Sequence, residues 1–181
     1  MAIDVCGRSG GLASGWNMQS FRCEGMCSLS SGIGMELFDA HLGMVLTILN
    51  IYVPYLNQVP FWTTLLGKSF ISNRKVILGG ELNFSLGSAE VWGPRVVSDS
   101  LAPYFSRHDL MEIAHIHISP TWWNKRTGDN RVAKRLDIFL VTDCLLMECD
   151  LVRQWVACGG SLIISLFSLR FKVGIRNLPS Q

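Results

Sequence analysis

The sequence predicts an α+β fold in which two β-sheets form a sandwich flanked by helices. Segments with strand character outnumber helical segments, and at least one amphipathic helix falls between two strands. The chain has 181 residues, 49% of them apolar and 17% charged, a globular composition with enough length for one domain and its core. We therefore expect one domain over residues 1–181, without internal repeats.

The first third of the chain contains the most clearly predicted elements. Short strands are expected at residues 10–13 and 35–38, and residues 44–53 form a long run rich in β-branched side chains that ends at Pro54. An apolar run of this kind is typical of a strand that is buried on both faces. Residues 60–71 then carry apolar side chains at helical spacing, which predicts an amphipathic helix.

Residues 75–78 form a second, shorter apolar strand, which leads directly into Gly79 and Gly80. A polar loop follows at residues 85–100. The rest of the chain predicts a short helix and five more strands. They are a helix at residues 101–107 and strands at residues 110–113, 121–123, 135–141, 152–156 and 162–171.

The first residues, the length of the apolar stretches and the cysteines favour an intracellular protein that does not enter a membrane. The first residues lack the basic and apolar parts of a signal peptide. The most apolar stretches, residues 44–55 and 162–171, are about half the ~20 residues that a membrane span needs. Six cysteines in a chain without a secretory signal favour reduced thiols. Cys23 and Cys27 lack a second pair and a nearby histidine, so we expect no zinc site.

A basic cluster follows two tryptophans in the second half of the chain. The side chains are Trp122 and Trp123, then Lys125, Arg126, Arg131, Lys134 and Arg135. The net charge of +2 is too small to indicate a nucleic-acid partner, so only a local cluster can do so. Basic side chains bind backbone phosphates, and rings such as that of Trp122 stack on bases, which predicts contact with DNA. Alternatively, the segment is a solvated hairpin whose aromatic rings belong to the core.

The sharpest local signal for chemistry is the end of the second apolar strand. Residues 76–84 read Val-Ile-Leu-Gly-Gly-Glu-Leu-Asn-Phe. Glu81 and Asn83 are two residues apart, which places their side chains on one face of an extended backbone. A carboxylate beside a carboxamide can orient a water molecule and bind a phosphate oxygen. From the spacing alone, the alternative is a turn in which Asn83 caps the segment that follows.

Residues 79–84 resemble the Gly-Gly-Asp-x-Asn motif of the endonuclease/exonuclease/phosphatase superfamily, whose fold is also called DNase I-like. Other segments are similar, in the same order, to the plant non-LTR retroelement branch of that superfamily. They are residues 7–13, 49–55, 90–94, 120–122, 131–137 and 153–156. The resemblance covers residues 7–161 and implies a DNase I-like sandwich of two β-sheets flanked by helices.

The resemblance also implies hydrolysis of DNA phosphodiesters with the help of a divalent cation, usually Mg²⁺. In the superfamily, the tyrosine at the position of Tyr52 approaches the phosphate with its hydroxyl. The acid and the amide at the positions of Glu81 and Asn83 position the attacking water and the phosphate. The aspartate at the position of Asp137 orients a histidine near the end of the domain. The basic segment at residues 125–135 is placed beside the cleft.

The chain departs from the superfamily pattern in ways that bear on activity. The metal-site Asn and the metal-binding Glu of the superfamily belong to strands that precede the segment at which this chain begins, so we expect a partial domain that is incomplete at its N-terminus. Glu81 stands where the superfamily has Asp, and a displacement of ~1 Å can cost ~10²-fold in rate. Residues 159–164 lack the Asp and His of the Ser-Asp-His motif, so Asp137 has no histidine partner there. Glu81 is left as a candidate ligand for Mg²⁺.

The four histidines do not replace the missing partner. His115 and His117 share one face of a strand, but no carboxylate accompanies them at a ligand spacing. His41 reads as a loop residue and His108 as a surface residue. We therefore expect satisfied or exposed histidines rather than a second metal site.

Three functions remain open. The chain is a metal-dependent nuclease with residual activity, a non-catalytic remnant of a retroelement, or a module that binds nucleic acid. A phosphatase of inositol phosphates or lipids uses the same fold, but the segment matches favour the retroelement branch. The missing ligands predict little or no turnover. The absent first strands predict an exposed sheet edge through which the chain self-associates.

Overall fold

The computed structural model describes residues 2–3, 12–67, 74–94, 101, 105–113, 117–159 and 162–171. The strands are β1 (Ala2–Ile3), β2 (Leu12–Ala13), β3 (Phe21–Leu29), β4 (Gly32–Asp39), β5 (Met44–Tyr52), β6 (Val76–Glu81), β7 (Val91–Trp92), β8 (Leu110–Glu112), β9 (Trp122–Trp123), β10 (Ala133–Lys134), β11 (Asp137–Thr142), β12 (Cys149–Gly159) and β13 (Leu162–Phe171). The helices are α1 (Gln58–Leu66) and α3 (Asp143–Met147), with 3₁₀ turns at Ser88–Glu90 and Gly128–Asn130. The predicted α+β class is confirmed.

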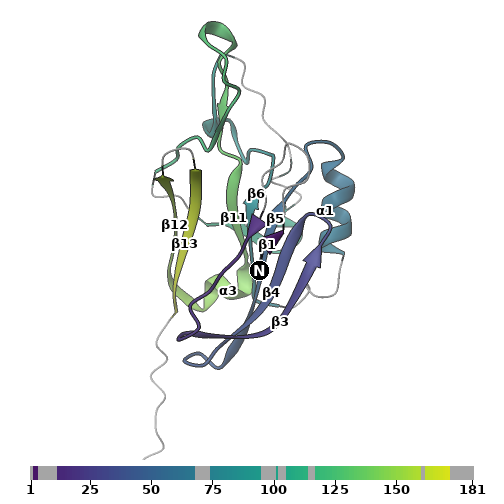
Figure 1. The fold of residues 1–181 in the computed structure, drawn as a ribbon, viewed down its shortest axis with the longest axis vertical. Coiled ribbons are helices and arrows are strands. Elements are labelled where there is room, and N and C mark those ends of the chain that lie inside the picture. The colour runs from purple at the N-terminus through teal and green to yellow at the C-terminus, as the bar shows by residue number, and fades with distance from the viewer. Residues whose placement is uncertain are drawn as a thin grey trace, which may run out of the picture.

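A six-stranded sheet with the strand order β3-β4-β5-β6-β11-β8 forms the centre of the fold. β5 and β6 run parallel, whereas the other neighbouring pairs in this sheet are antiparallel. A parallel pair needs a crossover connection, and α1 lies in the connection from β5 to β6. The smaller sheets are β7-β10-β9, β1-β2 and β12-β13. Figure 1 shows α1 and the β12–β13 hairpin on opposite sides of the central sheet.

The face of the central sheet toward α1 buries an aromatic cluster. The ring of Trp62, on α1, lies edge-on to Phe105 with 4.7 Å between the ring centroids, and Phe105 stacks on Phe84 at 4.9 Å. Such ring pairs contribute about 0.5–1.5 kcal/mol beyond the area they bury. The apolar residues at helical spacing in the sequence are the ones that the helix buries. The spacing places Trp62 and Leu65 on the side of α1 that faces the sheet.

The opposite face of the central sheet is also covered. Leu46 and Ile77 pack with Leu145 of α3 in one buried cluster. Ile33, on β4, belongs to a second cluster, and Trp16 packs against it. Because the sheet is covered on both faces, β5 carries apolar side chains in both directions, which is the reason that its sequence reads as a continuous apolar run.

Most predicted elements are confirmed, with changed ends. The long apolar strand is β5, the second apolar strand continues as β6 to Glu81, and the predicted helix runs from Gln58 to Leu66. Parts of the predicted segments at residues 7–13, 60–71, 85–100 and 101–107 lie outside the described residues. β3 and α3 were not predicted, because β3 carries Cys, Gly and Ser where a buried strand has β-branched residues, and α3 is a single short turn. Among the described residues, no helix is long and apolar enough to cross a membrane.

β3 is the edge strand of the described sheet. Arg22 and Glu24 form an ion pair of 2.7 Å on it, and the pairing with β4 shifts register between Cys23 and Gly25. Charged side chains and bulges on an edge strand oppose pairing with another chain. Self-association through this edge, expected from the sequence, would have to overcome both features. Cys23 and Cys27 are free thiols on the same strand.

Two glycines allow β6 to lie against its neighbours. Gly80 has a φ of 127°, a region that side chains rarely adopt, and a Cβ there would lie 2.1 Å from the carbonyl oxygen of Ile51 on β5. A Cβ on Gly79 would lie 2.2 Å from the ring of Phe139 on β11. The Gly-Gly pair is therefore required by the close packing of three strands.

Replacing Gly80 with alanine is expected to destabilise the fold by ~2 kcal/mol or more, because the added methyl meets a backbone oxygen and cannot rotate away from it. Urea unfolding of Gly80→Ala beside Gly15→Ala tests this. Gly15 is an exposed glycine whose added Cβ would meet nothing within 4 Å. Equal stability of the two variants would contradict the assigned packing.

Candidate active site and basic arm

Three of the predicted site residues lie side by side at one end of the central sheet. Tyr52 on β5 pairs with Glu81 on β6, and Glu81 pairs with Asp137 on β11. Paired strands lie about 4.8 Å apart, so the three residues form a continuous row, which we call the site row. Their chain neighbours Ile51 and Ile138 are buried in the core beneath α1, so the site row faces the other side of the sheet.

Asn83 is fixed beside the site row, at the end of β5. Its Nδ2 donates a hydrogen bond of 2.6 Å to the carbonyl oxygen of Val53. The backbone carbonyl oxygen of Asn83 accepts a hydrogen bond of 2.6 Å from Nε2 of Gln58, the first residue of α1. The backbone φ of Asn83 is 54°, which asparagine adopts more readily than most residues with a side chain. The fold thus brings together all four residues that the sequence singled out.

Both carboxyl groups of the site row are held closer to their neutral form than usual. Burial raises the pKa of Glu81, and the neighbouring charge of Asp137 raises it further. Burial also raises the pKa of Asp137, while a hydrogen bond from Thr121 acts in the opposite direction. The two carboxylates repel each other when both are charged, and this repulsion adds to the effect of burial on Glu81.

Asn50 supports the site row in a way that the sequence did not reveal. It lies two residues before Tyr52 and therefore on the same face of β5. Its Nδ2 donates hydrogen bonds of 3.0 Å to the carbonyl oxygen of Ala13 and 3.0 Å to Oγ of Ser14. The segment that follows β2 is thereby attached next to the site row.

The basic cluster lies on an arm that projects beyond the end of the central sheet (Figure 1). The arm is the β9–β10 hairpin with its loop, residues 122–134, and β10 pairs with β7 as well. Nδ2 of Asn124 donates a hydrogen bond of 2.7 Å to the carbonyl oxygen of Asn130 across the loop. Trp122 and Trp123 are 40% and 52% exposed, so the alternative in which these rings belong to the core does not hold.

The positive charges of the cluster divide into two groups. Lys125, Arg126 and Arg131 are exposed on the arm, and Lys134 is half-buried at its base. These four side chains are placed where a phosphate backbone can reach them. Arg135 is placed differently.

Arg135 corrects the cluster that the sequence predicted. Its side chain is only 1% exposed and forms ion pairs with Glu90 and Glu112. Nε of Arg135 donates a hydrogen bond of 2.9 Å to Oε1 of Glu90. A buried guanidinium that two carboxylates neutralise is not available to a phosphate. Local sequence could not show this, because the partners are 45 and 23 residues away along the chain.

The described residues provide two oxygen donors for Mg²⁺ and no complete set of ligands. Glu81 and Asp137 are carboxylates of the kind that Mg²⁺ prefers. Among the residues that the structure describes, however, no three His, Cys, Asp or Glu side chains gather to hold a metal ion. The residues present therefore do not fit a resident Mg²⁺ ion.

The three described histidines are exposed. His41 is exposed in the turn after β4, and His108 and His117 are exposed as well. His115 lies outside the described residues, so the structure does not test whether it shares a strand face with His117.

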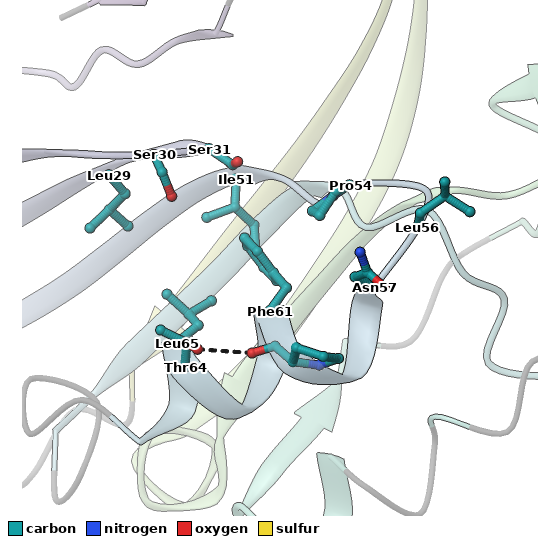
Figure 2. A pocket seen from close by; sticks show the side chains of 11 residues that line it. Leu29, Ser30, Ser31, Ile51, Pro54, Leu56, Asn57, Phe61, Thr64 and Leu65 are labelled. Carbon is teal, nitrogen blue, oxygen red and sulfur yellow. Dashed lines mark hydrogen bonds between the residues drawn. The ribbon is translucent and has the colours of Figure 1, made fainter.

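A pocket of about 430 Å³ lies on the α1 side of the sheet, between α1 and the β3–β4 turn (Figure 2). Ser31, Leu56 and Phe61 are among its lining residues, and Ile51 forms part of its floor. Because Ile51 and Tyr52 point to opposite faces of β5, the sheet separates this pocket from the site row. We assign it no part in the chemistry of the row.

The fold is DNase I-like. One similar solved structure is the endonuclease domain of TRAS1, a telomere-specific non-LTR retrotransposon, with 17% identity, a TM-score of 0.50 and coverage of 79% of this chain and 65% of that one. The endonuclease/exonuclease/phosphatase family protein from Bacteroides thetaiotaomicron matches with 9% identity over 86% of this chain and 63% of that one, at a TM-score of 0.47. A 3′ phosphatase, NExo from Neisseria, bound to a product DNA hairpin, matches with 14% identity over 68% and 56%, at 0.46.

At these identities the likeness shows the fold alone, and the two matches with TM-scores below 0.5 add nothing to it. No family model and no curated protein matches the sequence. The chain spans 65% of the length of the TRAS1 endonuclease domain. The likeness does not establish a ligand or an activity for this chain, so a function has to be argued from its own residues.

The raised pKa values predict how stability depends on pH. The folded state binds more protons than the unfolded chain between the ordinary and the raised pKa of Glu81 and Asp137, so the free energy of unfolding falls as pH rises through that window. We expect Glu81→Gln to be more stable than the wild type at neutral pH and to show a shallower fall as pH rises above the ordinary pKa of a glutamate. Thermal unfolding at several pH values measures this, with Glu24→Gln on the exposed edge strand as the matched control. A Glu81→Gln variant with the wild-type pH slope would contradict the burial and repulsion assigned to the pair.

Proposed function

We propose that this chain is a DNA-binding domain of the endonuclease/exonuclease/phosphatase type that retains part of a phosphodiester-cutting site and hydrolyses DNA slowly or not at all. The observation that carries the proposal is the register that aligns Tyr52, Glu81 and Asp137 next to Asn83. The segment matches to the plant non-LTR retroelement branch support descent from an element of that kind.

The site row can perform part of the chemistry of phosphodiester hydrolysis. The Tyr52 hydroxyl is a hydrogen-bond donor for a phosphate oxygen, and Asn83 lies beside it. Glu81 in its charged form can take a proton from an attacking water molecule, and a pKa raised toward neutrality suits a general base. Asp137 lies next to Glu81, and its negative charge contributes to the raised pKa of Glu81.

We expect slow turnover because the described site row supplies no positive group to stabilise the charge that develops on the phosphate. Hydrolysis of a phosphodiester builds negative charge on the phosphate and the leaving oxygen, which positive groups or a metal ion must stabilise. Arg135 is the cation closest in sequence to Asp137, and it is buried in ion pairs with carboxylates. The proposed hydrolysis does not use Mg²⁺, because the described residues do not fit the ion.

A non-catalytic role as a nucleic-acid-binding module is the second candidate. It is favoured by the arm, whose exposed tryptophans and cations are present whether or not the site row is active. The two candidates differ in one respect, namely whether changing Glu81 affects DNA hydrolysis.

Nicking of supercoiled plasmid with and without Mg²⁺ tests the catalytic part. Any nicking by the wild type is expected to fall by ~10²-fold or more in Glu81→Ala, because the proposed general base is lost. Glu24→Ala, which removes an exposed carboxylate at the sheet edge, should nick like the wild type. Turnover at ~1 s⁻¹ or faster with Mg²⁺ would contradict slow hydrolysis. Nicking that survives in Glu81→Ala would mean that the site row does not carry it.

Binding of a short DNA duplex, followed by fluorescence anisotropy over a range of salt concentrations, tests the arm. Each phosphate contact contributes about 0.9 to the slope of log affinity against log salt concentration, so Lys125→Ala/Arg126→Ala should lower that slope by ~2. Arg22→Ala/Arg74→Ala removes the same charge at the opposite end of the strands and should leave the slope unchanged. Absence of binding at ~50 mM salt, or equal losses in both variants, would exclude the arm as the contact surface.

A further inference from the structure

We propose that Gln58 is a positioning residue that holds Asn83 in place beside the site row, an inference that rests on the function proposed for the row. Gln58 is the first residue of α1, which packs on the opposite face of the central sheet. Its Nε2 donates a hydrogen bond of 2.6 Å to the backbone carbonyl oxygen of Asn83, which lies 25 residues away along the chain. No local pattern in the sequence marks Gln58, because its partner is remote.

Asn83 adopts a backbone conformation that needs support from its surroundings. Its φ of 54° lies in the left-handed region, which is disfavoured for residues with a side chain. Such a conformation persists only where the surrounding structure fixes it. The neighbours Leu82 and Phe84 are fully buried in the core beneath α1, which anchors the backbone on both sides of Asn83. The hydrogen bonds of Asn83 itself then set the direction of its carboxamide.

Two hydrogen bonds hold Asn83 from the two ends of the segment that joins β5 to α1. At one end, Nδ2 of Asn83 donates a hydrogen bond of 2.6 Å to the carbonyl oxygen of Val53, a buried residue that directly follows β5. At the other end, Gln58 donates to the backbone carbonyl of Asn83. Only the nitrogen of a carboxamide can donate to a carbonyl, so the contact with Val53 also fixes which atom of the Asn83 amide is the oxygen. The side chain and the backbone of Asn83 are therefore held by separate partners.

Gln58 is itself held firmly enough to support another residue. α1 is fixed in the core by Trp62 and Leu65, and the residues on both sides of Asn83 belong to the same buried cluster. Gln58 is half-buried next to this cluster. Displacement of a reacting group by ~1 Å can cost ~10²-fold in rate, so a fixed support of this kind matters for the site row. Loss of the Gln58 donor should release Asn83 without unfolding α1.

Solvent exchange of the side-chain amide protons, followed by NMR in the full chain without DNA or metal, tests the contact in the wild type. Gln19 is an exposed glutamine and serves as the reference. We expect the Nε2 protons of Gln58 to exchange about fivefold more slowly than those of Gln19, because a hydrogen bond of ordinary strength changes an equilibrium by about that factor. Equal exchange of the two glutamines would overturn the proposal.

The variant Gln58→Glu removes the donor and keeps the size of the side chain. The first turn of α1 carries no acidic residue, and the helix dipole favours one there, so this change does not weaken the helix. We expect the side-chain amide protons of Asn83 to exchange about fivefold faster than in the wild type, while the indole signal of Trp62 keeps its position. Gln19→Glu, the same chemical change at an exposed site, should leave Asn83 unchanged.

Two outcomes of the variant experiment would overturn the positioning role. One is exchange of the Asn83 side chain at the wild-type rate in Gln58→Glu. The other is a set of shifts that spreads along α1 to Trp62, which would indicate a general structural role. If Gln58→Glu does not fold, Gln58→Met, which also lacks a donor, takes its place in the same measurement.

The exchange measurements need neither DNA binding nor hydrolysis, so failure of the proposed function is recognised separately by the nicking and binding assays. If the wild type nicks plasmid, Gln58→Glu should lower the rate at saturating DNA by about tenfold and leave the DNA concentration at half-maximal rate unchanged. A rise in that concentration at an unchanged maximal rate would contradict a role of Gln58 in positioning Asn83 for the reaction.

Discussion

The parallel pairing of β5 with β6 is the constraint on which the candidate site depends. Its register sets Tyr52 against Glu81, and the pairing of β6 with β11 adds Asp137 to the same line. Because side chains alternate between the faces of a strand, a slip of one residue would turn Glu81 into the core beneath α1. Gly80 protects this register, since its backbone lies so close to the carbonyl of Ile51 that no side chain fits between them. The glycines of the motif thus serve the geometry of the site as well as the turn.

The short segment from β10 to β11 connects the arm, for which we propose DNA binding, to the site row. Lys134 belongs to the arm, Arg135 is buried between two carboxylates, and Asp137 belongs to the site row. Removing one partner of a buried ion pair typically costs about 3–5 kcal/mol, so this anchor resists changes in the orientation of the arm. The arm is positively charged and attracts a phosphate backbone, whereas the acidic site row repels one. Burial reduces that repulsion, because it keeps Glu81 and Asp137 nearer to their neutral forms.

Local patterns in the sequence predicted the parts of the fold that depend on local physics. The apolar run of β5 and the helical spacing of α1 are recognisable in the sequence alone, and so are the acid at the end of β6 and the amide two residues later. The register between strands is set by contacts between segments far apart in sequence, so the alignment of Tyr52 with Asp137 could only come from the structure. The same reason explains Arg135, which reads as one more solvated cation until Glu90 and Glu112 are placed around it. The edge strand β3 lacked a readable pattern, because in the described sheet it pairs on one side only and much of it is exposed.

We propose that the arm and the site row contact the same DNA duplex. Titration of the chain with a short duplex, followed through the NMR signals of its backbone amides and tryptophan indoles, tests this. We expect shifts at the Trp122 and Trp123 indoles and at the amides of Tyr52 and Asn83. The indole of Trp62, buried beneath α1 on the other face of the sheet, should not move. Shifts confined to the arm, or shifts centred on Trp62 and the pocket beside α1, would contradict a shared substrate.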